Sequence, residues 1–120
     1  MPSQKIDIDV RTYEFALQVL SIVDVIPNSH SGTVIARQLA RSGTSIGANV
    51  EESRASESRL DFIHKLNIAL KEARETHYWL RIIRDKKLIE PDRLASLVQE
   101  SEEIKKILGA SVRTAKAKKK

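Results

Sequence analysis

The chain has 120 residues, of which 31% are charged and 41% hydrophobic, a balance typical of one folded domain and not of a disordered segment. It contains no cysteine, which excludes disulfides, thiolate catalysis and cysteine-based zinc sites. Residues 1–112 carry 16 basic and 16 acidic side chains, so the net charge of +5 comes from five basic residues in 113–120.

An apolar pattern of helical period predicts a first helix over residues 9–26. Aspartates precede it where a signal peptide needs an apolar run, and polar residues interrupt its most apolar part. We therefore expect a cytoplasmic protein without a membrane span. The helix has two apolar stripes. One consists of Val10, Tyr13, Leu17 and Leu20, and the other of Phe15, Val19, Ile22 and Ile26.

A turn at residues 27–32 separates this helix from a second one, predicted over 34–54 with Ser31 or Thr33 as its cap. Gly43 and Gly47 lie inside this second helix, although each costs about 1 kcal/mol relative to alanine there. Small residues at this spacing indicate that another helix approaches closely. Ser42, Ser45 and Asn49 share one side, which predicts a half-polar face pressed against a partner helix.

A third helix is predicted over residues 59–87, where Ser58 precedes Asp61 as in a capping box. The fourth runs over 91–114 and begins at a proline, which the first turn of a helix tolerates. Because the three loops are short, we expect an all-α, antiparallel up-and-down four-helix bundle. The bundle domain would span residues 1–114, and residues 115–120 would form a basic disordered tail.

The third helix has a further stripe beside its main apolar one, made of Ile68, Glu72, Glu75, Trp79 and Ile82. A small bundle needs one apolar stripe per helix, so the surplus predicts an interface between copies of the chain. The predicted interface residues are Phe15, Val19, Ile22, Ile68, Trp79 and Ile82. The alternative is that these broad faces fill the core of the bundle itself.

If the second and third helices form a hairpin that turns near Glu57, Arg41 lies close to Glu72 and Glu75. An arginine fork paired with carboxylates is tolerated when it is partly buried. We expect Arg41, Asn49, Glu72 and Glu75 to form a structural polar network that sets the register of the two helices. The alternative is a pocket that binds a ligand.

A di-metal site in a helical bundle needs two Glu-x-x-His motifs and two further glutamates. The only similar motif here joins Asp61 to His64, and neither His30 nor His77 has a partner at ligand spacing. No glycine-rich phosphate loop and no nucleophile motif is present. We therefore expect no metal, no cofactor and no enzymatic activity.

The basic residues at the end of the chain can attract polyanions. The predicted nucleic-acid-binding residues are Arg113, Lys116, Lys118, Lys119 and Lys120. The alternative is a solvated end that only aids solubility.

The run Ser-Ile-Gly-Ala-Asn-Val-Glu-Glu at 45–52, preceded by Arg37-Gln38-Leu39 and Arg41-Ser42, resembles the signature of the four helix bundle protein family. Members of that family include proteins encoded in intervening sequences of bacterial 23S ribosomal RNA genes. The resemblance continues in residues 68–80 and 111–116, and it covers about residues 8–116. It implies a ring-shaped homopentamer.

A relative within the broader family is the accessory variability determinant of diversity-generating retroelements, which binds a reverse transcriptase and nucleic acid. The resemblance therefore implies a non-enzymatic oligomeric adaptor for RNA or DNA, or for a nucleic-acid enzyme such as a reverse transcriptase. The alternative is a pure protein–protein interaction scaffold with no role in nucleic-acid binding.

Overall fold

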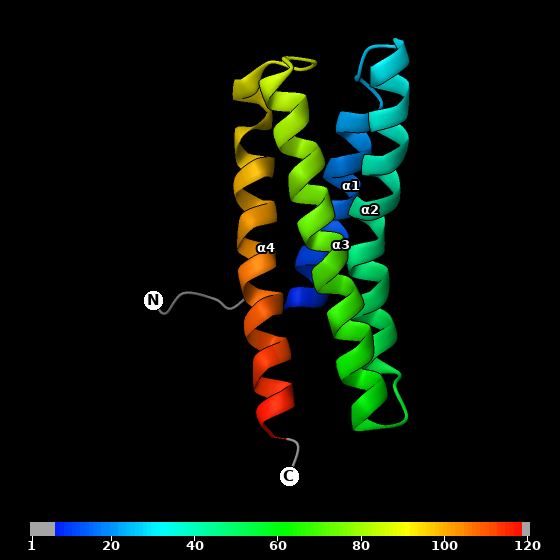
Figure 1. Ribbon diagram of the computed structural model, residues 1–120, viewed down its shortest axis with the longest axis vertical. Coiled ribbons are helices and arrows are strands. Elements are labelled where there is room, and N and C mark those ends of the chain that lie inside the picture. The colour runs from blue at the N-terminus through cyan, green and yellow to red at the C-terminus, as the bar shows by residue number, and fades with distance from the viewer. Residues whose placement is uncertain (1–6, 119–120) are drawn as a thin grey trace.

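The computed structural model describes residues 7–118, which form four helices: α1 (Ile8–Val23), α2 (His30–Arg54), α3 (Arg59–Asp85) and α4 (Pro91–Ala117). Consecutive helices run in opposite directions, and α1 lies behind α2 and α3 (Figure 1). The predicted all-α up-and-down four-helix bundle is thus confirmed. Assembly of copies into a ring stays a prediction.

The first loop differs from its predicted form. Helix α1 ends at Val23, three residues early. The backbone N–H groups of Val25 and Ile26 donate to carbonyls three residues back, at 3.0 and 3.3 Å, and Pro27 has no N–H with which to continue the helix. Helix α2 begins at His30, so neither Ser31 nor Thr33 caps it. The cap is Ser29, whose hydroxyl oxygen accepts a 3.0 Å hydrogen bond from the backbone N–H of Gly32.

Both ends of α3 are closed by hydrogen bonds between residues that are near in sequence. The hydroxyl of Ser58 accepts a 3.0 Å hydrogen bond from the backbone N–H of Asp61, which confirms the predicted cap. At the other end, Lys87 adopts a left-handed conformation with φ of 59°. This allows the N–H of Leu88 to donate to the carbonyl of Ile83 at 3.0 Å, which satisfies one of the last carbonyls of the helix.

The predicted boundary between a bundle at 1–114 and a disordered tail at 115–120 lies too early. Helix α4 continues to Ala117, and Ala115 is buried. Its side chain extends the buried stripe formed by Leu108 and Val112, at spacings of four and three residues. The core therefore holds another turn of helix in place, and Lys119 and Lys120 lie outside the described residues.

The two glycines of α2 allow α1 to approach closely. A Cβ atom on Gly43 would lie 2.7 Å from Cγ1 of Val19, and one on Gly47 would lie 3.2 Å from the hydroxyl of Thr12. The adjacent Ser42 faces another helix: it is buried against α3, where its hydroxyl is hydrogen-bonded to that of Thr76 at 2.9 Å. Helix α2 thus packs on two partners.

Three of the predicted interface residues lie in the core of the single subunit. Phe15, Val19 and Ile22 have exposed fractions of 1%, 0% and 7%, so no other copy can reach them. Val19 fills the space beside Gly43 of α2, which accounts for its burial. Of the predicted α3 residues, Trp79 and Ile82 pack against the same core and are partly buried, as is Ile68. For these α3 side chains the alternative, packing within the bundle, describes the observed contacts.

Candidate nucleic-acid and subunit interfaces

The other apolar stripe of α1 is the one that remains uncovered. It consists of Val10 (48% exposed), Tyr13 (57%), Leu17 (51%) and Leu20 (40%). These positions recur at helical spacing on the side of α1 opposite Phe15 and Val19. A helix that is apolar on both sides is normally buried on both sides. We refer to these four residues as the outer stripe of α1.

Basic side chains gather at the end of the bundle where α4 terminates. Arg113, Lys116 and Lys118 are all exposed there. The turn between α2 and α3 lies at the same end (Figure 1). It brings Arg59 to α4, where the guanidinium donates a 3.4 Å hydrogen bond to the carbonyl of Ala115. Sequence reasoning missed Arg59, because 56 residues separate it from that carbonyl.

A cleft of about 1280 Å³ separates α1 from α4. Phe15, Phe62 and Leu108 contribute apolar side chains to its lining. An ion pair bridges it: Nε and one terminal nitrogen of Arg11 donate to the two carboxylate oxygens of Glu100, at 2.6 and 2.9 Å. Within residues 7–118, this fork-to-fork contact is the only side-chain hydrogen bonding that joins α1 directly to α4.

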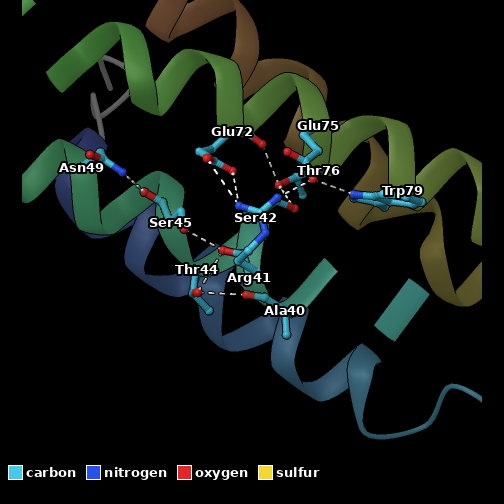
Figure 2. Close-up of polar contacts among 10 residues, drawn as sticks. All are labelled: Ala40, Arg41, Ser42, Thr44, Ser45, Asn49, Glu72, Glu75, Thr76 and Trp79. Carbon is cyan, nitrogen blue, oxygen red and sulfur yellow. Dashed lines mark hydrogen bonds and ion pairs between the residues drawn. The ribbon is translucent and has the colours of Figure 1, made fainter. Parts of the chain in front are cut away.

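Figure 2 shows the polar network between α2 and α3. Arg41 donates to the carboxylates of Glu72, at 3.3 Å, and Glu75, and the indole N–H of Trp79 donates to Glu75 at 3.0 Å. The hydrogen bond from Arg41 holds the pKa of Glu75 below its usual range. The predicted pairing of these three ionic residues is present. Asn49 is separate, because its amide donates to the backbone carbonyl of Ser45 on its own helix.

His77 lies between α3 and α4, partly buried among charged groups. Its Nε2 is 3.3 Å from a carboxylate oxygen of Glu102, and its Nδ1 is 3.5 Å from the ammonium of Lys105. Burial lowers the pKa of His77 below the ordinary value of 6.5, and the positive charge of Lys105 lowers it further, while Glu102 opposes the change. The fold therefore favours the neutral imidazole.

We expect an NMR titration to place the pKa of His77 below 6.5. Because the folded-state pKa is below the unfolded one, the neutral ring stabilises the fold above about pH 6.5, and this stabilisation is lost as the pH falls through the folded pKa. Replacing Lys105 with methionine should raise the pKa, since one nearby positive charge disappears. A pKa of His77 at or above 6.5 in the unaltered protein would contradict the described surroundings of the ring.

Among residues 7–118 no group of three or more His, Asp or Glu side chains is placed to hold a metal ion. His64, from the single acid-x-x-His motif, is exposed on α3. Within the same range, none of the helices combines the length and the apolar character that crossing a bilayer requires.

These features define a class: an all-α, up-and-down four-helix bundle. A comparison with protein-family models matches residues 4–110 to the 23S rRNA-intervening sequence protein family. The chain therefore belongs to this family.

Among solved structures, the chain is similar to a protein of unknown function from the S23 ribosomal protein family of Bacteroides thetaiotaomicron. The two are 40% identical in sequence, with a TM-score of 0.82. The match covers 88% of this chain and 98% of the other. A search of curated proteins found no match. These matches show the family and the fold of the chain, and the matched protein is itself of unknown function.

Proposed function

We propose that this protein is a non-enzymatic, cytoplasmic, oligomeric adaptor that binds nucleic acid, a nucleic-acid enzyme such as a reverse transcriptase, or both. The observation that carries the proposal is the basic end of α4. Arg113, Lys116 and Lys118 are exposed there, and two further lysines follow in the sequence. The rest of the chain is electrically balanced, so this end dominates the attraction of polyanions.

Oligomerisation would bring the basic ends of several subunits together. The outer stripe of α1 supports association of copies, because four large side chains there are 40–57% exposed on one helix face. A homopentamer, the state implied by the family resemblance, would bring together about 25 positive charges from its five basic ends. Binding would then depend mainly on phosphates and would release many counterions.

The test is the salt dependence of binding, measured by fluorescence anisotropy with a labelled single-stranded RNA. A tail variant replaces Arg113, Lys116, Lys118, Lys119 and Lys120 with glutamine, which keeps Ala115 and the last turn of α4 intact. We expect its affinity to fall at least about tenfold. The slope of log K against log salt should decrease by about 3, since each phosphate that a single strand no longer pairs with a cation removes roughly 0.7.

A control variant replaces three exposed cations near the other end of the bundle, Arg37, Lys87 and Arg93, with glutamine. It should bind within about twofold of the unaltered protein at a fixed salt concentration, because these residues lie far from the basic end. Equal losses in both variants, or binding that ignores salt, would contradict the proposed mechanism.

The second candidate function is a protein–protein scaffold with no role in nucleic-acid binding. The outer stripe of α1 favours it, since apolar surface of this kind serves protein contacts and not phosphates. An unaltered protein that fails to bind RNA and DNA at low salt, yet retains a protein partner after nuclease treatment, would establish this second function in place of the first.

A further inference from the structure

Helix α3 presents an unusual outer face. Between His64 and Arg84, its exposed residues are His64, Lys71, Arg74, Tyr78 and Arg81. All five lie on the side of the helix away from its buried stripe of Leu66, Ala73 and Leu80. Three are permanent cations, one is a histidine, one is an aromatic residue, and none is acidic. We call Lys71, Arg74, Tyr78 and Arg81 the outer row of α3.

The acidic residues nearest to this row are already engaged. Glu72 and Glu75 lie on the flank toward α2 and are paired with Arg41. Asp85, beyond the end of the row, is paired with its neighbour Arg84 at 2.8 Å. Arg41 offsets one of its two carboxylates and Arg84 offsets Asp85, so the three cations of the outer row exceed the one negative charge left beside them, and the row forms a positive surface on the body of the bundle.

The flank toward α4 adds no net negative charge to this surface. Lys105 lies 3.5 Å from His77, and it forms an ion pair with Glu102 at 3.1 Å. Arg81, Arg84 and Lys105 each act on His77 in the direction that lowers its pKa, as expected where cations outnumber the nearby carboxylate.

Tyr78 interrupts the row with an aromatic ring that is 50% exposed. The ring is held in place by its neighbours: Trp79 packs against it edge-on, with centroids 5.2 Å apart, and the guanidinium of Arg81 lies 5.9 Å from its centroid. A flat aromatic surface beside cations is the combination that proteins use to stack an unpaired base while they hold the adjoining phosphates.

The length of the row suits a nucleic-acid strand. Arg81 lies ten positions after Lys71, which corresponds to about 15 Å along the helix at 1.5 Å per residue. One strand of a stacked nucleic acid places a phosphate about every 3.4 Å along its axis, so the row spans about four phosphates. An acidic peptide would match the charge, but it would leave the half-exposed tyrosine without a partner.

We propose that the outer row of α3 is a nucleic-acid contact surface distinct from the basic end of α4. Lys71, Arg74 and Arg81 would bind phosphates of a single strand, and Tyr78 would stack against one unpaired base. The inference rests on the proposed function and extends it to a second site. The row lies on the side of α3 away from the core, and the outer stripe of α1 lies on a different helix, so association of copies through α1 can leave the row open.

The test compares two variants that lose the same charge. The row variant, Lys71→Gln/Arg74→Gln/Arg81→Gln, is matched by the control variant Arg37→Gln/Lys87→Gln/Arg93→Gln. Binding of a labelled 20-nucleotide single-stranded RNA is measured by anisotropy over a range of salt concentrations. We expect the affinity of the row variant to fall at least about tenfold and its salt slope to decrease by about 2, at roughly 0.7 for each phosphate. The control should change affinity by less than about twofold.

Substitutions of Tyr78 distinguish a surface that binds nucleic acid from one that binds any polyanion. Tyr78→Ala should weaken RNA binding by about fivefold or more, whereas Tyr78→Phe should retain it, because stacking needs the ring and not the hydroxyl. Neither change should alter binding of polyglutamate. If Tyr78→Ala leaves RNA affinity unchanged, or if the row and control variants bind RNA equally, the inference is overturned.

Failure of the inference and failure of the proposed function give different results. If the unaltered protein binds RNA and the tail variant is weakened while the row variant is not, only the second site is refuted. If the unaltered protein does not bind RNA or DNA at low salt, the proposed function itself fails. Circular dichroism melts of each variant verify folding, which we expect to persist because the substituted side chains within residues 7–118 are all exposed.

Discussion

Replacing Gly43 with alanine is expected to destabilise the protein, although alanine is the better helix former. The added Cβ would lie 2.7 Å from Cγ1 and 3.0 Å from Cγ2 of Val19, a fully buried residue with a stiff β-branched side chain. Overpacking of this kind costs about 1–3 kcal/mol, and the gain in helix propensity returns about 1 kcal/mol. We expect the free energy of unfolding, measured in urea, to fall by up to about 2 kcal/mol.

Gly109 provides a matched control in the same fold. An added Cβ there would meet only the side chain of Arg113, at an ordinary 3.6 Å, so Gly109→Ala should raise the free energy of unfolding by about 0.5–1 kcal/mol. The double variant Gly43→Ala/Gly47→Ala should lower it further, by up to about 4 kcal/mol, since the second Cβ meets backbone atoms of Thr12 at 3.3 Å. Stabilisation by Gly43→Ala as large as that by Gly109→Ala would show that α1 does not press against α2.

Replacing Leu17 with glutamate should dissociate the proposed oligomer. Leu17 lies within the outer stripe of α1 and is 51% exposed in the single subunit. If this stripe is covered by another copy, the substitution places a charge in an apolar contact, which is costly unless the charge is paired. Light scattering should then report a mass near 13.5 kDa, where the unaltered pentamer would give about 67.5 kDa.

Leu60 serves as the control for this experiment. It is the most exposed large apolar residue of the described chain, at 71%, and it lies in the first turn of α3, away from the outer stripe of α1. Leu60→Glu should leave the mass unchanged. A monomeric unaltered protein at micromolar concentration would remove the oligomer altogether, and an unchanged mass for Leu17→Glu would show that copies associate through another surface.

The sequence predicted most of the local structure, for reasons that act over a few residues. The period of apolar residues located all four helices, and Ser58 was the correct cap of α3, because both signals lie within one or two turns of the chain. The wrong predictions at Ser31, Thr33 and the end of α4 concern boundaries. At the end of α4 the boundary depended on a neighbour in the fold, because the core buries Ala115. At the start of α2 the observed cap is again local, since Gly32 donates to Ser29 three residues earlier.

The candidate surfaces were predictable only in part. The basic end of α4 and the pairing of Arg41 with Glu72 and Glu75 followed from counting along the chain and along a helical hairpin. The outer row of α3 was missed, although its cations are plain in the sequence. Only the fold shows which α3 cations are exposed together on one side of the helix, away from its buried stripe.

By itself, the sequence determined that this protein is a helical bundle without cysteine chemistry, and that α1 is apolar on two sides. It did not determine which side of α1 faces inward, because both stripes have the same period and similar hydrophobicity. The tertiary structure decided this. The space left by the missing side chains of Gly43 and Gly47 receives Val19 and Thr12, and this contact turns Val10, Tyr13, Leu17 and Leu20 outward.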